Sequence, residues 1–416
     1  MVVRGVAGGV VSTLVPGPAG AQSVLMIKDT DTTTIDTLTT DGEVLHATGG
    51  KPLQGRKVRT SVKVALCGLL FWSSPLTTVE AAEPRPFGDA KVLAQVPTPP
   101  GFPEGIAVQG NRVYVAGPAT FGTTGKPRSR VVAFSTLTGA QVASYETKGE
   151  NVLAEHANSS IAFDGSGRLY VLNTQLGMYR LTPATGKQEP YGDPFPDLPP
   201  CVLSPAPCSP APSPTPPLPN DLAFDDAGNA YVTDAMQATI WRVPAGGGAP
   251  QIWFQDSRLA SAYIGVNGIR LDPTRTNVVI TVTADLVGQS FVYTLPLVDN
   301  PAAADLAVFH HYGPGELPDG VAFGASGLLY VAIATPGASG VSVLAPNGEE
   351  KARLANPLGS PVKPYDSPAN IAFNAKGSIL LSNHAFVTGV VDPSAFNVLD
   401  VFVGDTASPL AKPIVP

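Results

Sequence analysis

The sequence PDGVAFGASGLLYVAI at residues 318–333 has the pattern of a β-hairpin. A short apolar run leads into a turn that contains Gly327, and a second apolar run with a Tyr-Val pair follows the turn. Glycine suits such a turn because it adopts a positive φ at little cost. Five further segments share the pattern: PEGIAVQGNRVYVAG from Pro103, SSIAFDGSGRLYVLN from Ser159, PNDLAFDDAGNAYVTD from Pro219, VNGIRLDPTRTNVVITV from Val266 and PANIAFNAKGSILLSN from Pro368.

The spacing of these six hairpins indicates the architecture. Their central apolar residues are 47 to 61 residues apart, and more strand-like sequence follows each hairpin. Six units of about fifty residues, each with room for four strands, predict an all-β fold, a six-bladed β-propeller over residues 83–416. Residues 90–96 and 398–405 are expected to pair and close the ring. A parallel β-helix is the competing interpretation, but its repeats are much shorter.

The composition agrees with this fold class and excludes others. The 416 residues are 44% hydrophobic and only 14% charged, which is unlike a disordered polyelectrolyte. Glycine and proline number 43 each, a density that long helices do not tolerate. The net charge of −7 gives no basic surface for nucleic acid. No run of 18 apolar residues is present, so no stable membrane span is expected.

The N-terminal part looks like a leader. Residues 1–55 are rich in Gly, Thr and Val without a clear period, and we predict a disordered extension there. Residues 56–82 combine a basic stretch, the apolar run VALCGLLFW and a small-residue end at Ala81-Ala82, the pattern of an export signal. A buried strand is the alternative. Because this signal begins so far inside the chain, we hypothesise a true start near Val58 or Val62. The protein is expected to be secreted or held in the periplasm or cell envelope.

The cysteines fit export. Cys67 would leave with the signal, so only Cys201 and Cys208 remain as a possible pair. They lie in a proline-rich insertion at residues 190–219. We predict a disulfide between them, with two free thiols in a flexible loop as the alternative.

One set of positions, two residues before the central apolar residue of each hairpin, begins what would be the innermost strands. It comprises Glu104, Ser159, Asn220, Asn267, Asp319 and Ala369. Four of these residues carry the carboxylate or amide oxygens that hard cations prefer. No cysteine or suitably spaced histidine pair joins them, which favours Ca²⁺, or another hard divalent metal, over zinc. Each Asn or Asp alone could simply form a turn, but their shared register in a ring indicates a metal site.

At these motifs the sequence resembles the senescence-marker/gluconolactonase family of calcium-dependent six-bladed propellers. It also resembles diisopropyl fluorophosphatase, NHL-type propellers and, more distantly, paraoxonase. In that group a glutamate, two asparagines and an aspartate hold the catalytic metal. The resemblance implies that Glu104 in PEG, Asn220 in PND, Asn267 in NG and Asp319 in PDG do so here. Ser159 stands where paraoxonase-like members have a histidine.

Further residues are expected at the same mouth, because a hairpin returns its second strand to the face where the first began. The predicted substrate rim consists of Ser159, Asn173, Asp234, Asn370, Asn383 and His156, and His384 is placed beside it. His384 is the histidine expected to move a proton, with a simple rim hydrogen bond as the alternative. His310 and His311 lie on a segment that enters this face. Arg270 interrupts a column of alanines, where a structural salt bridge is favoured over anion binding.

Three functions remain open from the sequence. The first is an exported, metal-dependent hydrolase of a lactone or related ester, with a small-molecule substrate and with Asp319 and His384 as catalytic residues. The second is a non-catalytic NHL-like propeller that binds a ligand or protein and holds a structural ion. The third is a strictosidine-synthase-like propeller with other chemistry. Fold alone does not choose between them.

Overall fold

The computed structural model describes residues 85–360 and 362–416, together with the backbone of five strands near the N-terminus. The chain divides into two units, Met1–Ala81 and Ala82–Pro416. The first unit contains one antiparallel sheet in the order β1-β2-β3-β4-β5. Its strands are β1 (Val3–Ala7), β2 (Val10–Val15), β3 (Val24–Asp29), β4 (Ile35–Leu38) and β5 (Val44–His46). These strands lie within residues 1–55, for which the sequence predicted a disordered extension. The predicted export signal at residues 56–82 lies outside the described residues.

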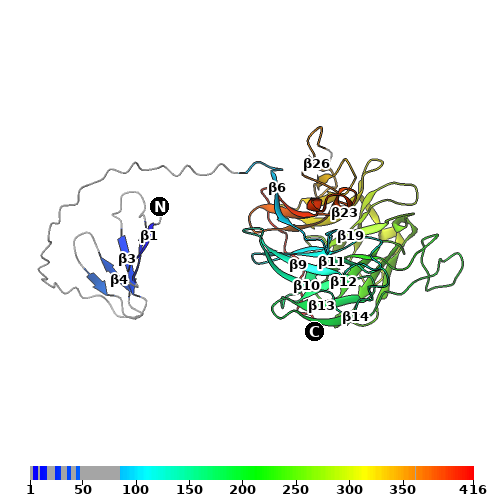
Figure 1. Ribbon diagram of the computed structural model, residues 1–416, viewed down its shortest axis with the longest axis horizontal. Helices are drawn as coiled ribbons and strands as arrows, with labels where there is room; N and C mark the ends of the chain where they lie inside the picture. Colours follow the sequence, from blue (N-terminus) through cyan, green and yellow to red (C-terminus); the bar gives the residue numbers. More distant parts are fainter. Residues whose placement is uncertain are drawn as a thin grey trace, which may run out of the picture. The chain divides into compact units, whose positions relative to one another are not determined.

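The second unit is a six-bladed β-propeller, as predicted (Figure 1). Each blade is a four-stranded antiparallel sheet. Blade 1 holds β7 (Ile106–Gln109), β8 (Arg112–Gly117), β9 (Arg130–Ser135) and β10 (Gln141–Glu146). Blade 2 holds β11 (Asn158–Phe163), β12 (Leu169–Asn173), β13 (Gly177–Thr182) and β14 (Lys187–Gly192). Blade 3 holds β15 (Pro219–Phe224), β16 (Ala230–Asp234), β17 (Thr239–Val243) and β18 (Gln251–Gln255).

The remaining blades follow the same plan. Blade 4 holds β19 (Val266–Leu271), β20 (Asn277–Val282), β21 (Phe291–Pro296) and β22 (Ala307–His311). Blade 5 holds β23 (Pro318–Phe323), β24 (Leu329–Ile333), β25 (Gly340–Leu344) and β26 (Glu350–Ala355). Blade 6 holds β27 (Pro368–Phe373), β28 (Ser378–Asn383), β29 (Asn397–Phe402) and, as its outermost strand, β6 (Ala90–Gln95). The antiparallel pairing of β6 with β29 closes the ring, as the sequence predicted.

Helical structure in the described residues is limited to four short 3₁₀ turns. They are η1 (Ser257–Leu259), η2 (Ala303–Asp305), η3 (Thr388–Val390) and η4 (Pro393–Ala395). Within the described part of the chain, no helix has the length and apolar character needed to span a membrane.

The repeated aromatic residues of the hairpins join neighbouring blades. In three places, the tyrosine of the second strand in one blade meets the phenylalanine that ends the innermost strand of the next blade, edge to face. The pairs are Tyr114–Phe163 (5.1 Å between ring centroids), Tyr170–Phe224 (5.0 Å) and Tyr330–Phe373 (5.3 Å). Each such pair contributes about 0.5–1.5 kcal/mol beyond its buried area. The Tyr in the repeat therefore stabilises the packing of one blade on another.

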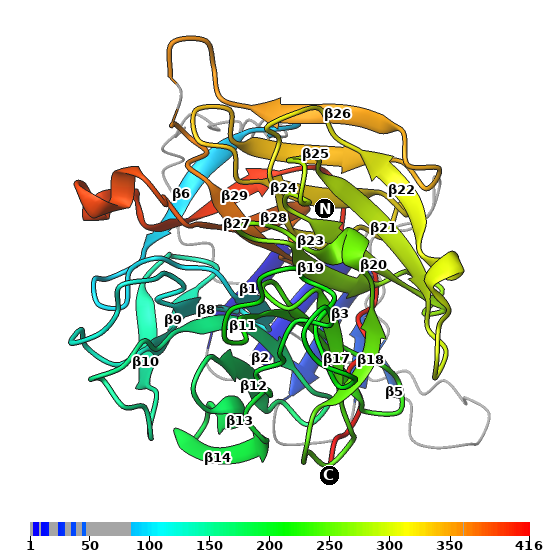
Figure 2. The ribbon, with the colours of Figure 1, turned by 90° about the vertical axis from the view of Figure 1, so that its right-hand side faces the viewer.

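The innermost strands surround a central channel. Each of them contacts the next around the ring, and Figure 2 shows the six sheets arranged about a common centre. Because successive strands alternate in direction, the connections alternate between two faces. We call the face where the innermost strands begin the mouth face, and the face with the hairpin turns the turn face. The C-terminal segment 404–416 lies on the turn face, where Ala407 bridges Gly324 and the Gly165 amide donates to the Pro413 carbonyl (2.8 Å).

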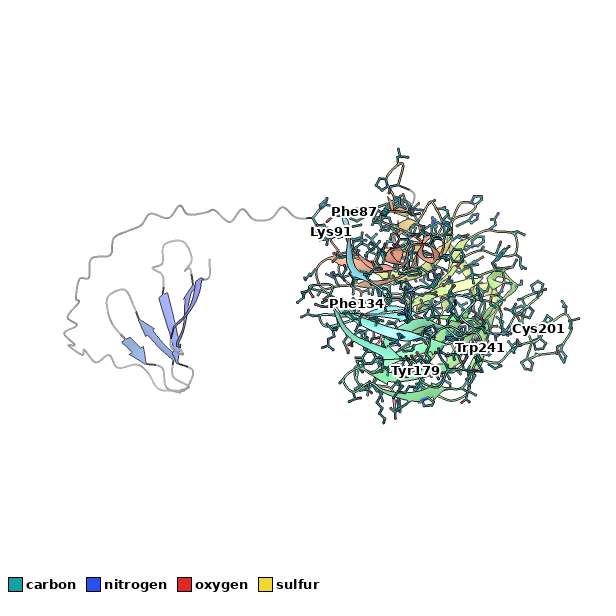
Figure 3. The ribbon with its side chains drawn as sticks, in the orientation of Figure 1. Phe87, Lys91, Phe134, Tyr179, Cys201 and Trp241 are labelled. Atoms are coloured by element: carbon teal, nitrogen blue, oxygen red, sulfur yellow. A yellow bond between two sulfur atoms is a disulfide. The ribbon has the colours of Figure 1, made fainter. Side chains whose placement is uncertain are left out.

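The proline-rich insertion connects blades 2 and 3 on the mouth face. Cys201 and Cys208 are disulfide-bonded with a Cα–Cα distance of 4.9 Å, which confirms the predicted pair. Figure 3 shows Cys201 on the loop that projects from the propeller. The base of the insertion is attached to blade 3, because the Ser209 hydroxyl donates to the Gln237 carbonyl (2.7 Å) and Leu198 is buried. The tip is exposed, as the exposed fraction of 82% at Leu203 shows.

Replacing Cys201 and Cys208 together by serine should loosen the insertion and leave the propeller folded. In the chain-entropy model a loop this short contributes about 2–3 kcal/mol at most, and the buried base does not depend on the sulfur bridge. We expect faster protease cleavage within residues 201–208, followed by mass spectrometry, and an unchanged far-UV circular dichroism spectrum. Loss of the cooperative melting transition in the double variant would contradict this assignment.

Candidate functional site

The start of each innermost strand has an irregular register that turns side chains toward the channel. In blades 2 to 5 the pairing with the second strand skips two residues, for example between Pro219 and Leu222 and between Pro318 and Val321. Blade 6 has a shorter irregularity at the same place. Such bulges re-aim side chains and are common next to active sites. The skipped residues include Asn220, Asn267 and Asp319, so the local fold presents three of the four predicted ligands at the mouth.

These ligands and Glu104 come together in two pairs. The Glu104 carboxyl accepts a hydrogen bond from the Asn220 side chain, and the Asp319 carboxyl accepts one from the Asn267 side chain. The negative charge of Asp319 also acts on Glu104. Side chains from blades 1, 3, 4 and 5 therefore lie near one another on the mouth face.

The surroundings of both carboxyls disfavour the ionised form. Burial raises the pKa of Glu104 well above its usual value, and the charges of Asp319 and Asp221 raise it further. Burial likewise raises the pKa of Asp319, with Asp221 adding to the effect. Asp319 keeps some exposed surface toward the channel, but the surrounding protein excludes most of the water that would stabilise its charge. Two such carboxyls favour either a bound proton or a bound cation.

Asn267 supplies a free oxygen beside them. Its Nδ2 donates to the Thr283 hydroxyl (2.8 Å), and that hydroxyl donates in turn to the Pro318 carbonyl (2.8 Å). Since the only hydroxyl proton of Thr283 is used, the amide of Asn267 must present its NH₂ group to Thr283. Its Oδ1 is buried and has no hydrogen-bond partner among the described residues. A buried acceptor without a partner calls for an explanation, and a cation ligand is one.

The donor set fits a hard divalent cation. It consists of two carboxylates and two amides, all oxygen ligands of the kind calcium takes. In the described part of the chain, no group of three or more His, Cys, Asp or Glu side chains is arranged to hold a metal. A site built here would therefore depend on the two asparagines as well as the two acids.

The other two positions of the ring do not join this set. Ala369 has no ligand atom, and the Ser159 hydroxyl donates to the Pro219 carbonyl of the next innermost strand (2.6 Å). Ser159 therefore ties blade 2 to blade 3.

His384 lies next to Glu104 at the mouth. Its Nδ1 is 3.9 Å from Glu104 Oε2, too long for a hydrogen bond, and this nitrogen is buried without a partner. The ring also donates to the Pro103 carbonyl, so the proton is assigned to the other nitrogen, Nε2. Burial lowers the pKa of His384 to about 4. The pair with Glu104 is thus a neutral imidazole beside a carboxyl and not a salt bridge.

Several predicted rim residues have their polar groups used inside the blades. Asn173 donates to Glu150 Oε1 (2.6 Å), and its Oδ1 accepts from two turn amides. Asp234 accepts four hydrogen bonds, including those from Gln237 (2.7 Å) and the Trp241 indole (3.1 Å).

The same holds for two more of the predicted rim residues. Asn383 Oδ1 accepts from the Asp366 amide (2.7 Å), and both ring nitrogens of His156 lie within 3.0 Å of backbone carbonyls. These residues hold loops on the mouth face, and we leave them out of the proposed site.

Two histidines expected near the mouth lie elsewhere. His310 and His311 are on β22, the outermost strand of blade 4, where His311 stacks on Phe291 (4.6 Å). A segment that leads to the mouth face need not reach the channel, because it first forms the edge of its blade.

A second layer of polar residues lies further along the innermost strands. Arg270 Nη1 donates to Asp221 Oδ2 (2.7 Å) and its Nη2 donates to Asn370 Oδ1 (3.2 Å), so the favoured structural salt bridge is present. Asp221 is the residue that sequence reasoning missed. Its place directly after Asn220 in PND was the available signal, because the bulge brings both residues to the channel.

Comparison with known proteins gives the fold class. No protein-family model and no curated protein matches the chain. Among solved structures it is similar to the calcium-binding protein regucalcin from Agrobacterium tumefaciens, with 16% identity over 79% of this chain and 98% of the other, at a TM-score of 0.55. It is also similar to the pyrroloquinoline-quinone-bound aldose sugar dehydrogenase of Streptomyces coelicolor (13% identity, 76% and 98% covered, TM-score 0.51).

A luciferin-regenerating enzyme matches more weakly, at 13% identity, coverage of 78% and 99% and a TM-score of 0.48. The regucalcin match confirms at the level of fold the resemblance stated from the sequence.

The metal-free protein should lose stability as the pH rises. Glu104 and Asp319 keep protons in the folded state at pH values where the unfolded chain, with ordinary pKa values of 4.5 and 3.8, has lost them. The free energy of unfolding therefore falls as pH rises through that interval. A calcium ion bound to these carboxyls would replace the protons, so its stabilising effect should grow from pH 5 to pH 8. At a free calcium concentration 100 times its Kd we expect about 2.7 kcal/mol at pH 8, measured by calorimetry.

Glu104→Gln is the matched variant for this experiment, because it keeps the size and removes one charge. It should flatten the pH dependence in the presence of a chelator. His384 gives the opposite slope, since its pKa of about 4 means that stability is lost as pH falls from 6.5. A calcium effect that is equal at pH 5 and pH 8 would exclude the two carboxyls as ligands.

Proposed function

We propose that the propeller is a divalent-metal-dependent hydrolase that acts on a lactone or related ester, with calcium as the ion. One observation carries the proposal: two buried atoms without a hydrogen-bond partner lie beside the two carboxyls at the mouth. His384 Nδ1 lies near Glu104, and the amide that carries Asn267 Oδ1 contacts Asp319. A purely structural ion would explain the Asn267 oxygen, but it would leave His384 without a role.

Four residues would hold the ion: Glu104, Asn220, Asn267 and Asp319. When bound, it supplies a Lewis acid that polarises a carbonyl oxygen. The Asn267 amide is oriented for this by Thr283, and Glu104 is set by Asn220. These contacts fix the ligands before substrate arrives, which is what electrostatic catalysis requires.

Asp319 is the residue proposed to take the proton of the attacking water. The water oxygen bonds to the carbonyl carbon, the ester C–O bond breaks, and the proton passes from the Asp319 carboxyl to the departing oxygen.

His384 has a different part in the proposal. It is neutral at pH 7 because its pKa is about 4. Its Nδ1 therefore accepts a hydrogen bond from the water or from a substrate hydroxyl. Phe102, whose ring centroid is 5.6 Å from that of His384, provides an apolar wall beside it.

Export of the protein belongs to the same proposal. The Cys201–Cys208 disulfide supports it, since such bonds persist in oxidising compartments. The substrate would then be a small molecule outside the cytoplasm.

Asp319→Asn separates catalysis from metal binding. The change keeps an oxygen ligand and the size but removes the base, so kcat on an active lactone should fall on the order of a hundredfold or more and stay low at saturating calcium. The measurement is hydrolysis of a lactone panel with calcium and with chelator. Tm with and without calcium reports whether the variant still folds and binds.

Asn267→Ala is the control, because it removes a neutral ligand and no base. Its activity should recover at least in part as calcium is raised. If both variants recover fully at saturating calcium, Asp319 is a ligand only. If the wild-type protein binds calcium and hydrolyses none of the panel, the non-catalytic propeller is the better description.

A further inference from the structure

Arg270 crosses the central channel. Its guanidinium reaches from β19 to Asp221 on β15 and to Asn370 on β27, and it also donates to the Ile269 carbonyl (2.6 Å). The predicted metal ligands lie on the mouth side of this residue. A cavity lies on the turn side of Arg270.

This cavity has a volume of about 400 Å³ and mostly apolar walls. The innermost strands contribute two layers of side chains to it. The upper layer is formed by Ala107, Ala162, Ala223, Ala322 and Ala372, and the lower layer includes Phe163, Phe224, Phe323 and Phe373. The small alanine side chain at five of the six equivalent positions creates this cavity, because larger side chains there would fill the channel. Its size is within the range of small-molecule sites.

The charged residues of the lining are already compensated. Arg270 pairs with Asp221 (2.7 Å), and Arg275 pairs with Asp226 (2.5 Å). A third charged lining residue, Asp272, accepts hydrogen bonds from its own turn, which lower its pKa.

Lys412 is the remaining charged lining residue, and it is exposed to solvent at the edge. The interior therefore offers no unpaired charge from the described residues, and it suits an uncharged apolar molecule.

A strap of the C-terminal segment, residues 407–412, crosses this cavity and forms part of its wall. Blade 5 holds one end, since the Ser408 amide donates to the Phe323 carbonyl (2.9 Å). Blade 2 holds the other end through Pro413. Between these anchors, Arg275 Nη2 donates to the carbonyls of Pro409 (3.3 Å) and Leu410 (3.2 Å).

Arg275 occupies an unusual position for an arginine. It has φ +58°, and it is the fourth residue of the turn in the blade 4 hairpin. The equivalent residues in four other blades are glycines with positive φ, Gly167, Gly228, Gly327 and Gly377. A side chain in this region of φ is strained, and such strain is retained where the side chain has a task. Here its visible contacts are Asp226 and the strap.

We propose that the turn-face cavity is a binding site for a small uncharged apolar molecule, and that Arg275 latches the strap at residues 407–412 as its lid. Sites for small molecules are concave and lined mainly by apolar side chains, as this cavity is. Arg270 lies on the mouth side of this cavity and the strap crosses its turn side, so we infer that movement of the strap widens the entrance. This site is independent of the proposed hydrolase activity.

The test uses N-phenyl-1-naphthylamine, an uncharged apolar dye that fluoresces in dry surroundings. The full chain should bind one dye per protein. Ala162→Leu combined with Ala372→Leu fills the cavity and should weaken binding at least about tenfold, the equivalent of 1.4 kcal/mol. Ala304→Leu, which adds the same group on the exposed surface, should bind as the wild-type protein does. Equal dye binding by the wild-type protein, the double variant and Ala304→Leu would overturn the proposed site. If the double variant does not fold, Ala372→Leu alone takes its place in the comparison.

Arg275→Gly tests the latch, because it installs the residue of the sister hairpins and relieves the strained φ. Tm should stay the same or rise, while stopped-flow association and dissociation of the dye should both become at least about tenfold faster. Unchanged dye kinetics in a folded Arg275→Gly protein would show that the strap is not the lid.

Discussion

The pairing of β6 with β29 is the constraint on which the rest of the propeller depends. It joins the two ends of the domain in one sheet, so the six innermost strands are held in a ring. Arg85 supports the joint, because its guanidinium contacts Asp89 (2.7 Å) and Asp400 (2.6 Å) on the two sides of it. Without closure the first and last blades would not be neighbours. Glu104 would then not face Asp319, since each blade delivers one side chain to a common centre.

Close approach of the innermost strands at the axis decides which residues fit there. A Cβ on Gly105 would lie 2.7 Å from the Ser159 carbonyl oxygen, and one on Gly268 would lie 2.5 Å from the Asp319 carbonyl oxygen. Only glycine fits at these two positions without a shift of the backbone, and each directly follows a predicted ligand, Glu104 or Asn267. The same closeness explains why the one long side chain of Arg270 bridges three blades.

The sequence predicted what repetition encodes. Six hairpins, ring closure and the Cys201–Cys208 bond could be read from it, because each leaves a signal in spacing or residue type. It could not show how each polar group is used. Asn173 and Asn267 look alike in sequence, yet the first is saturated by neighbours in its own blade and the second keeps a free oxygen. That difference arises from the hydroxyl of Thr283, sixteen residues away.

The position of the C-terminal strap could not be predicted from the sequence for a related reason. Residues 404–416 have no period and no motif, and their place is set by contacts with the turns of blades that lie far away in sequence. The one sequence signal for the strap is Arg275, an arginine at a turn position where four other hairpins have glycine. A residue that breaks a repeat is therefore informative in this fold, because the repeat supplies its own reference for what local structure requires.

Charge in the channel connects these features. Three carboxyls, Glu104, Asp221 and Asp319, lie close enough for their charges to act on one another, and one guanidinium, Arg270, pairs with Asp221. His384 does not add a positive charge at neutral pH, because burial lowers its pKa to about 4. Two buried negative charges are left, and buried charges persist only when paired. Protons can neutralise them at low pH, and one divalent cation can do so at neutral pH. Arg270 compensates Asp221, so Glu104 and Asp319 remain as the two carboxyls at the mouth without a cationic partner among the described residues. Together, their ionised forms carry the charge that one divalent cation would neutralise.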